Sequence, residues 1–179
     1  MKKLPARKFV FVDEFGANLG MTRRYARALR GKRAVGAVPA NPDPNITLVM
    51  GLRHDGIVAP FAFEGAMNGD TFTAYAETQL APHLQPGDIV FVDGLGSHRS
   101  RAARAAIEAR GAELRILPPY SPDLTPVEKS GSKVKEIVRG MDPRTVAAVI
   151  DAMGDGIGAV TAADARAWFA SSGYRINTG

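Results

Sequence analysis

The pattern of hydrophobic and polar positions along the chain predicts an α/β fold. Short apolar runs, rich in β-branched and aromatic residues, predict strands at 8–13, 46–53, 57–63, 89–92 and 114–117. Apolar positions at helical spacing predict helices over 71–84, 100–110, 126–139, 143–157 and 162–171. A tight turn at residues 54–56 pairs the second and third strands antiparallel, whereas the later strands alternate with helices. This order predicts one sheet of mixed direction flanked by helices.

Length and composition are typical of a single globular domain. The chain has 179 residues, 45% hydrophobic and 23% charged, and domains of roughly 100–200 residues are usual. The absence of cysteine excludes a disulfide framework, a thiolate zinc site and a cysteine nucleophile. The apolar runs are far shorter than the about 20 residues of a membrane span, and no signal-peptide stretch follows the basic N-terminus. We therefore expect an intracellular, cytoplasmic protein without a membrane partner.

Positive charge is concentrated at the N-terminal end. The net charge is +5, and residues 1–33 carry ten basic side chains but only two acidic ones. A basic segment on a near-neutral body suggests a polyanionic partner, most simply nucleic acid. A solvated, solubilising surface explains the charge pattern equally well.

Three acidic residues stand where chemistry is often found. Asp13 and Asp93 follow predicted strands, and Glu128 lies in the first turn of a predicted helix. If the two strands are neighbours, three carboxylates converge, and their repulsion requires cations between them. Oxygen ligands favour magnesium or manganese, and a pair of such ions activates a hydroxyl for attack on a phosphodiester.

Structural roles remain open for the same residues. Glu128 can complete a capping box with Thr125, and Asp13 and Asp93 can be turn or cap residues. His98 can contact a phosphate or lie solvated at the surface. Ser97 and His98 form no G-x-S-x-G elbow, and no glycine loop ends in Lys-Ser/Thr, so a serine hydrolase and a nucleoside-triphosphate enzyme are unsupported.

Three segments together carry a more specific signal. They are Phe-Val-Asp-Glu at 11–14, Val-Asp-Gly-Leu-Gly-Ser-His at 92–98, and Leu-Pro-Pro-Tyr-Ser-Pro-Asp-Leu-Thr-Pro-Val-Glu at 117–128. In this combination the chain resembles the DDE transposases of the mariner superfamily, in their bacterial insertion-sequence branch. The 34 residues between Asp93 and Glu128 match the family's spacing, and the resemblance extends to Gly173 and Tyr174.

The resemblance implies a ribonuclease H-like α/β domain over residues 1–179. It implies that Asp13, Asp93 and Glu128 are catalytic and hold two divalent metal ions, Mg²⁺ or its substitute Mn²⁺. Water would cleave DNA at the element ends, and the freed 3′-hydroxyl would attack target DNA, typically at a TA step. The same site would serve both steps.

The resemblance also implies partners. Family members recognise their ends with an N-terminal helix-turn-helix module, which we expect this chain to lack, because in this branch the gene is often split and the chain resembles the second half. The expected partners are DNA, the helix-turn-helix half and a second copy in a homodimer, with a nucleoid-associated location. Alone, the chain should bind DNA weakly through phosphates. The candidate contacts are Arg23, Arg24, Arg27, His98, Lys133 and Lys135.

Some positions depart from the family pattern. Gly94 and Thr125 each stand where Asn is usual, and Gly131 replaces an aromatic residue on the helix of the final Glu. Glycines at 154, 156 and 158 weaken the next predicted helix. These departures favour a second hypothesis, a catalytically decayed module that binds DNA or inhibits an intact transposase. A plain nuclease of the same fold is the third.

Overall fold

A five-stranded mixed sheet forms the centre of the computed structural model, which describes residues 5–118 and 124–176. The strands are β1 (Phe9–Ala17), β2 (Ile46–Arg53), β3 (Gly56–Glu64), β4 (Ile89–Val92) and β5 (Glu113–Ile116). Their order is β3-β2-β1-β4-β5. β1 pairs antiparallel with β2 and parallel with β4, and β4 pairs parallel with β5. The predicted mixed sheet is therefore present, with β1 at its centre.

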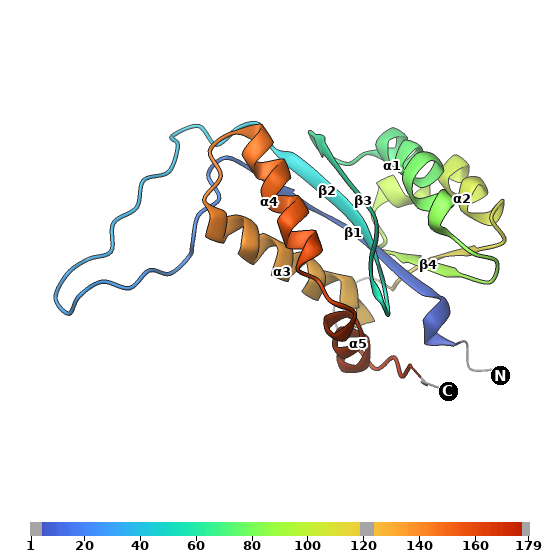
Figure 1. The fold of residues 1–179 in the computed structure, drawn as a ribbon. Coiled ribbons are helices and arrows are strands. Elements are labelled where there is room, and N and C mark those ends of the chain that lie inside the picture. Colours follow the sequence, from blue (N-terminus) through green and yellow to red (C-terminus); the bar gives the residue numbers. More distant parts are fainter. Residues whose placement is uncertain (1–4, 119–123, 177–179) are drawn as a thin grey trace.

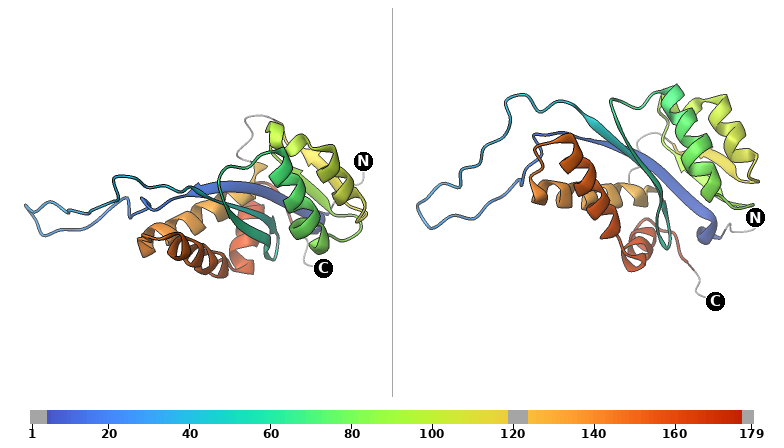
Figure 2. Two further views of the ribbon diagram at one scale, coloured as in Figure 1. Left: turned by 90° about the horizontal axis from the view of Figure 1, so that it is seen from above. Right: turned by 45° about the horizontal axis from the view of Figure 1, so that its top comes forward.

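Helices cover both faces of this sheet (Figures 1 and 2). On one face lie α1 (Gly69–Tyr75) and α2 (Arg101–Glu108), and on the other lie α3 (Pro126–Met141), α4 (Val146–Gly158) and α5 (Ala162–Ser171). Side chains at the N-caps start several of them: Asn68 and Thr161 form capping boxes, and Thr145 accepts from the Ala148 N–H. No single helix among the described residues is long and apolar enough to cross a membrane, although α4 and α5, bent by 76°, pass that test as a pair.

Two predicted elements differ from those observed. The first strand does not end at Asp13 but continues to Ala17, because β2 pairs with it as far as Ala17↔Ile46. The helix predicted over 71–84 consists of α1, a π-helical turn η2 (Ala76–Leu80) and a 3₁₀ turn η3 (Ala81–His83). Short turns of the 3₁₀ type, η1 (Ala6–Lys8) and η4 (Gly96–Arg99), precede β1 and follow β4.

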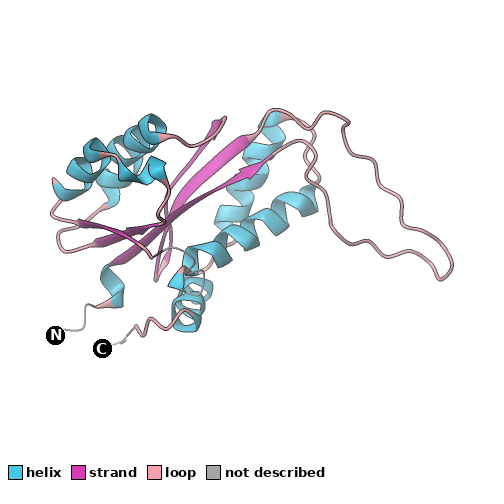
Figure 3. Ribbon diagram, turned by 180° about the vertical axis from the view of Figure 1, so that it is seen from behind, coloured by secondary structure: helices cyan, strands magenta, loops and turns pink. Residues whose placement is uncertain are grey.

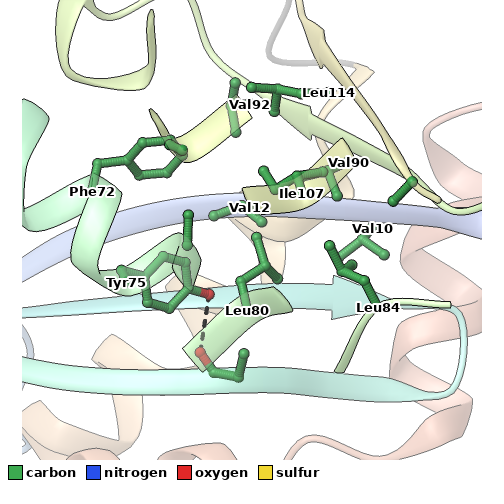
Figure 4. Close-up of a cluster of buried hydrophobic side chains, with 14 of the residues drawn as sticks. Val10, Val12, Phe72, Tyr75, Leu80, Leu84, Val90, Val92, Ile107 and Leu114 are labelled. Carbon is green, nitrogen blue, oxygen red and sulfur yellow. Dashed lines mark hydrogen bonds between the residues drawn. The ribbon is translucent and has the colours of Figure 1, made fainter. Parts of the chain in front are cut away.

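The face under α1 and α2 holds one hydrophobic cluster (Figure 4). Val10 and Val12 of β1 contribute to it, together with Phe72 and Tyr75 of α1. The hydroxyl of Tyr75 donates to the Ala59 carbonyl at 3.0 Å, which satisfies the polar atom that this buried ring brings with it. The cluster fixes α1 against the sheet.

The opposite face is packed closely enough that two glycines matter. A Cβ atom at Gly156 of α4 would lie 2.8 Å from Val134 Cγ1 and 3.2 Å from Val134 Cα on α3. At Gly131 of α3 the ring of Phe15 lies 3.4 Å from the Cβ position and fills the space beside the helix. The glycines at 154, 156 and 158 do not interrupt α4, and Gly156 permits the close crossing of α3 and α4. That these glycines weaken the helix stays a prediction.

Residues 18–45 form a long arm between β1 and β2 that extends away from the sheet (Figures 1 and 3). It contains no helix or strand, and most of its side chains are exposed. Arg144 ties its two ends together by donating to the carbonyls of Leu19, Met21 and Ala37. The arm is therefore anchored at its base on the loop between α3 and α4.

Candidate active site

Asp13 on β1 and Asp93, the residue directly after β4, occupy equivalent positions relative to these two neighbouring parallel strands. The register pairs Phe11 with Phe91, so each aspartate stands two residues beyond a paired phenylalanine. Side chains two apart in a strand share a face, which places Asp13 on the α3 side with Phe9 and Phe11. The expectation that the two strands are neighbours is correct.

The environment of Asp13 is unfavourable to its charge. Burial is the largest cause that raises the pKa of Asp13, from 3.8 to about 7. The Glu14 backbone N–H donates to Asp13 Oδ1 at 2.9 Å and opposes this rise. The negative charges of Glu14, Asp93 and Glu128 add to it. The charges of the other two predicted acids, Asp93 and Glu128, therefore both act on Asp13.

Glu128 reaches this region from the first turn of α3. Its neighbour Val127 packs with Phe9 and Phe11 of β1, which holds the start of the helix over the strand. The Thr125 hydroxyl donates to Glu128 Oε1 at 3.0 Å and makes no cap hydrogen bond to the backbone. The proposed role of Thr125 as a capping side chain is thus not observed, and the Glu128 carboxylate is exposed. Residues 119–123, the middle of the preceding Pro-rich loop, lie outside the described residues.

His98 lies between two acids instead of at the surface. Its side chain is fully buried, with Nδ1 2.6 Å from Asp93 Oδ1 and Nε2 3.2 Å from Glu14 Oε2. Burial lowers the pKa of His98, but Glu14 and Asp93 outweigh it and raise the pKa above its ordinary value. The solvated position is therefore wrong for His98, and a direct phosphate contact does not fit a side chain with no exposed surface.

The other candidate DNA contacts divide between the arm and α3. Arg23, Arg24 and Arg27 are exposed on the arm, and Arg23 donates to the Gly140 carbonyl at 3.3 Å near its base. Lys133 forms an ion pair with Asp164 at 2.7 Å. Lys135 lies 4.8 Å from the centre of the Phe15 ring. Their role in DNA binding stays a prediction.

The carboxylates of Asp13, Asp93 and Glu128 are suitable ligands for a divalent ion, although their side chains do not converge on one point in this structure. Asp13 is half-buried beside other negative charges, and hard oxygen donors are what Mg²⁺ and Mn²⁺ prefer. Within residues 5–118 and 124–176, no group of three acidic or histidine side chains is close enough to hold an ion as it stands. Asp13, Asp93 and Glu128 would be the residues that hold the metal, with their side chains moved from the positions they have in this structure.

The comparisons decide the family. Residues 8–149 match the family model of the DDE superfamily endonucleases. The chain belongs to the DDE superfamily. Among curated proteins there is no match to its sequence.

Solved structures of Mos1 transposase show the same fold as this chain. The Mos1 strand transfer complex is 17% identical with a TM-score of 0.72, and the match covers 93% of this chain and 52% of the Mos1 chain. The paired-end complex with the left transposon end gives 17% and 0.70, with coverages of 96% and 57%. The Mos1 catalytic domain alone gives 16% and 0.61, with coverages of 96% and 85%. The chain thus spans about half of the Mos1 chains in the DNA complexes, and the ribonuclease H-like fold is confirmed.

Sequence reasoning missed one part of the site, the contact between Glu14 and His98. Glu14 alternates with Asp13 along β1 and so lies on the α1 side, where Val10 and Val12 are buried. An acid on a buried face needs a polar partner. The period of two along β1 was the available signal, but nothing local identifies His98 as that partner.

Proposed function

We propose that this chain is the catalytic domain of a transposase that cleaves DNA and joins the freed 3′-hydroxyl to a target strand. The observation that carries the proposal is the environment of half-buried Asp13: burial raises its pKa to about 7, and the charges of Glu14, Asp93 and Glu128 add to this rise, which costs stability in the absence of a cation. Proteins keep such unfavourable charge clusters mainly where they are used. The insertion-sequence branch is part of the same proposal and rests on the three sequence segments.

The three acids divide the work by their places in the fold. Asp13 on β1 and Asp93 directly after the parallel strand β4 would hold the ions from the sheet, and Glu128 would complete the site from α3. When bound, two divalent ions lower the pKa of an attacking hydroxyl and stabilise the leaving oxygen. The protein's own contribution is to hold the carboxylates on rigid elements. Mos1 has been solved with Mg and with Mn, which supports the same ions here.

DNA binding in this proposal falls to basic residues outside the acid cluster. The exposed arginines of the arm at 23, 24 and 27 and the lysines of α3 at 133 and 135 would contact phosphates. Mos1 is solved in strand transfer and paired-end complexes, which supports transposon-end DNA, joined to a TA-type target, as the substrate. Recognition of end sequences would come from a helix-turn-helix partner, and a homodimer would pair two ends at the nucleoid.

Two observations favour the second candidate function, a DNA- or partner-binding module without catalysis. Glu128 is hydrogen-bonded to Thr125, and no metal-binding group of three side chains is present within the described residues. The argument from Gly131 is weaker than its sequence suggests, because Phe15 fills the space beside it.

A joining assay distinguishes the candidates. The chain is incubated in Mn²⁺ with supercoiled plasmid and a labelled duplex that carries a free 3′-hydroxyl, and nicking and label transfer are both scored. The comparison set is Asp13→Asn, Glu128→Gln and, as a control on an exposed face of α4, Asp151→Asn. Anisotropy of the same duplex measures binding.

Each outcome selects one function. Transfer of label by the unmodified chain and by Asp151→Asn, but not by the other two variants, supports the transposase. Nicking without label transfer contradicts strand transfer and indicates a nuclease. Tight binding of the duplex with neither reaction indicates the binding module.

A further inference from the structure

The imidazole of His98 lies between two carboxylates from different elements: Nδ1 is hydrogen-bonded to one, and Nε2 makes an ion-pair contact with the other without a well-formed hydrogen bond. Nδ1 lies 2.6 Å from Asp93 Oδ1, beyond the end of β4, and Nε2 lies 3.2 Å from Glu14 Oε2 on β1. The His98 side chain is fully buried, and that of Glu14 is only 15% exposed. His98 therefore joins the two central parallel strands at the point where the acid cluster begins.

Packing leaves this ring one orientation. The Phe72 ring of α1 lies 4.5 Å from the imidazole, tilted by 53°. The backbone is fixed as well, because the His98 N–H donates to the Leu95 carbonyl at 3.1 Å within the turn that leads into η4. A ring that cannot turn offers its Nδ1–H in a single direction.

The direction of the His98 Nδ1–H determines which oxygen of the Asp93 carboxylate is left available. Asp93 Oδ1 accepts both the His98 Nδ1–H and the Leu95 backbone N–H, the latter at 3.0 Å. Within the described residues no hydrogen bond reaches Oδ2. The Asp93 side chain is 46% exposed, so without these two donors it would be free to change rotamer. Two donors on one oxygen leave the other oxygen available in a fixed place.

We propose that His98 is a positioning residue for Asp93: it fixes Oδ1 so that Oδ2 is presented to a divalent cation, and the Glu14 carboxylate contacts His98 Nε2 from the far side. The inference rests on the proposed function, because it needs Asp93 to be a metal ligand. Hydrogen bonds to a ligating carboxylate orient it, and loss of such a partner typically weakens metal binding about 10- to 100-fold. Glu14 acts here through His98 and lies on the face of β1 opposite Asp13.

A purely structural role for His98 makes a different prediction. If His98 serves only the stability of the core, then any polar substitution that keeps the protein as stable as the unmodified chain should also keep its affinity for metal. In the proposed role, the position of the donor matters more than its presence. Two amide variants separate these cases, because an Asn amide nitrogen falls near the place of Nδ1 whereas a Gln amide nitrogen falls near that of Nε2.

The test is the affinity for Mn²⁺ alone, measured by calorimetry and by the electron paramagnetic resonance of bound Mn²⁺. The proteins are the unmodified chain, His98→Asn, His98→Gln and His98→Ala, each first checked by urea unfolding, and the signal of Trp168 reports folding. We expect His98→Asn to bind within about 3-fold of the unmodified chain and His98→Gln to bind about 10-fold or more weakly. His98→Ala should resemble His98→Gln.

The alternative results are distinguishable. Equal affinity of the Asn and Gln variants, whether both retained or both lost, contradicts the positioning role and leaves the metal site itself intact as a proposal. Absence of Mn²⁺ binding by the unmodified chain contradicts the proposed function, and the positioning role fails with it. Affinities that follow the unfolding free energies of the variants also overturn the inference.

Discussion

Removal of the Asp13 charge should stabilise the metal-free protein, by an amount that depends on pH. Asp13 has a folded-state pKa of about 7 against 3.8 for the ordinary group, so the folded protein binds its proton more tightly than the unfolded chain does. The unfolded chain releases that proton near pH 3.8, and the folded protein releases it only near pH 7. Stability therefore falls as the pH rises between these values. Above them, the folded state carries the full cost of the buried charge.

The size of the effect follows from the same shift. Each pKa unit corresponds to roughly 1.4 kcal/mol, so the complete cost is about 4 kcal/mol, of which about 3 kcal/mol develops between about pH 5 and about pH 8. Asp13→Asn carries no charge at either pH. The free energy of unfolding of Asp13→Asn, relative to that of the unmodified chain, should therefore be about 3 kcal/mol larger at the higher pH than at the lower one. Taking this difference between two pH values cancels the effect of the amide itself.

The assay is urea unfolding followed by circular dichroism, in EDTA, at both pH values. Asp151→Asn, an exposed change on α4, is the control and should shift equally little at both. An Asp13→Asn effect independent of pH, or one that decreases as pH rises, would refute the reasoning. Added Mn²⁺ should then stabilise the unmodified chain more than Asp13→Asn, because an ion that binds only the folded state stabilises it by mass action.

Four further substitutions test the packing and polar contacts of the fold. Gly156→Ala should destabilise the protein by about 1–2 kcal/mol, because its Cβ would meet Val134 at 2.8 Å, whereas Gly154→Ala on the same helix, with open space around it, should stabilise it by about 0.5–1 kcal/mol. Equal effects in urea unfolding would contradict the close crossing. Asp88→Asn should destabilise the protein by about 2 kcal/mol near neutral pH, because Asp88 pairs with Arg53. Burial raises the Asp88 pKa, but its charged and hydrogen-bonding partners lower it overall, so this destabilisation should diminish as pH falls through the acidic range. A destabilisation that is constant with pH would refute this. Tyr75→Phe should cost about 1–2 kcal/mol by leaving the Ala59 carbonyl unpaired, and an unchanged thermal midpoint would show that the hydroxyl contributes nothing (Figure 4).

The regular elements could be predicted because their signals are local. The apolar runs around Val10 and Val90 and the helix start at Pro126 depend on neighbouring residues, and the observed bounds lie close to those predicted. The end of β1 could not be predicted, because its last residues are held by pairing with β2, about 30 residues further along the chain. The π-helical turn after Tyr75 has no local signal either.

The candidate site, like the fold, could be predicted only in part from the sequence. Asp13, Asp93 and Glu128 stand at ends or starts of elements that their sequence neighbourhood marks, so the candidate acids could be named. The place of His98 could not, because its two carboxylate partners and the Phe72 ring meet it only in the folded protein. Residue type favours a histidine at the surface, and tertiary packing overrides that preference.

The most direct test of the central claim is a calorimetric Mn²⁺ titration of the unmodified chain beside Asp93→Asn and Asp151→Asn. The account predicts binding by the unmodified chain and by Asp151→Asn, with loss of at least one site in Asp93→Asn. Identical titrations for all three proteins, or no binding by any of them in millimolar Mn²⁺, would contradict the claim that Asp13, Asp93 and Glu128 form a metal-dependent site.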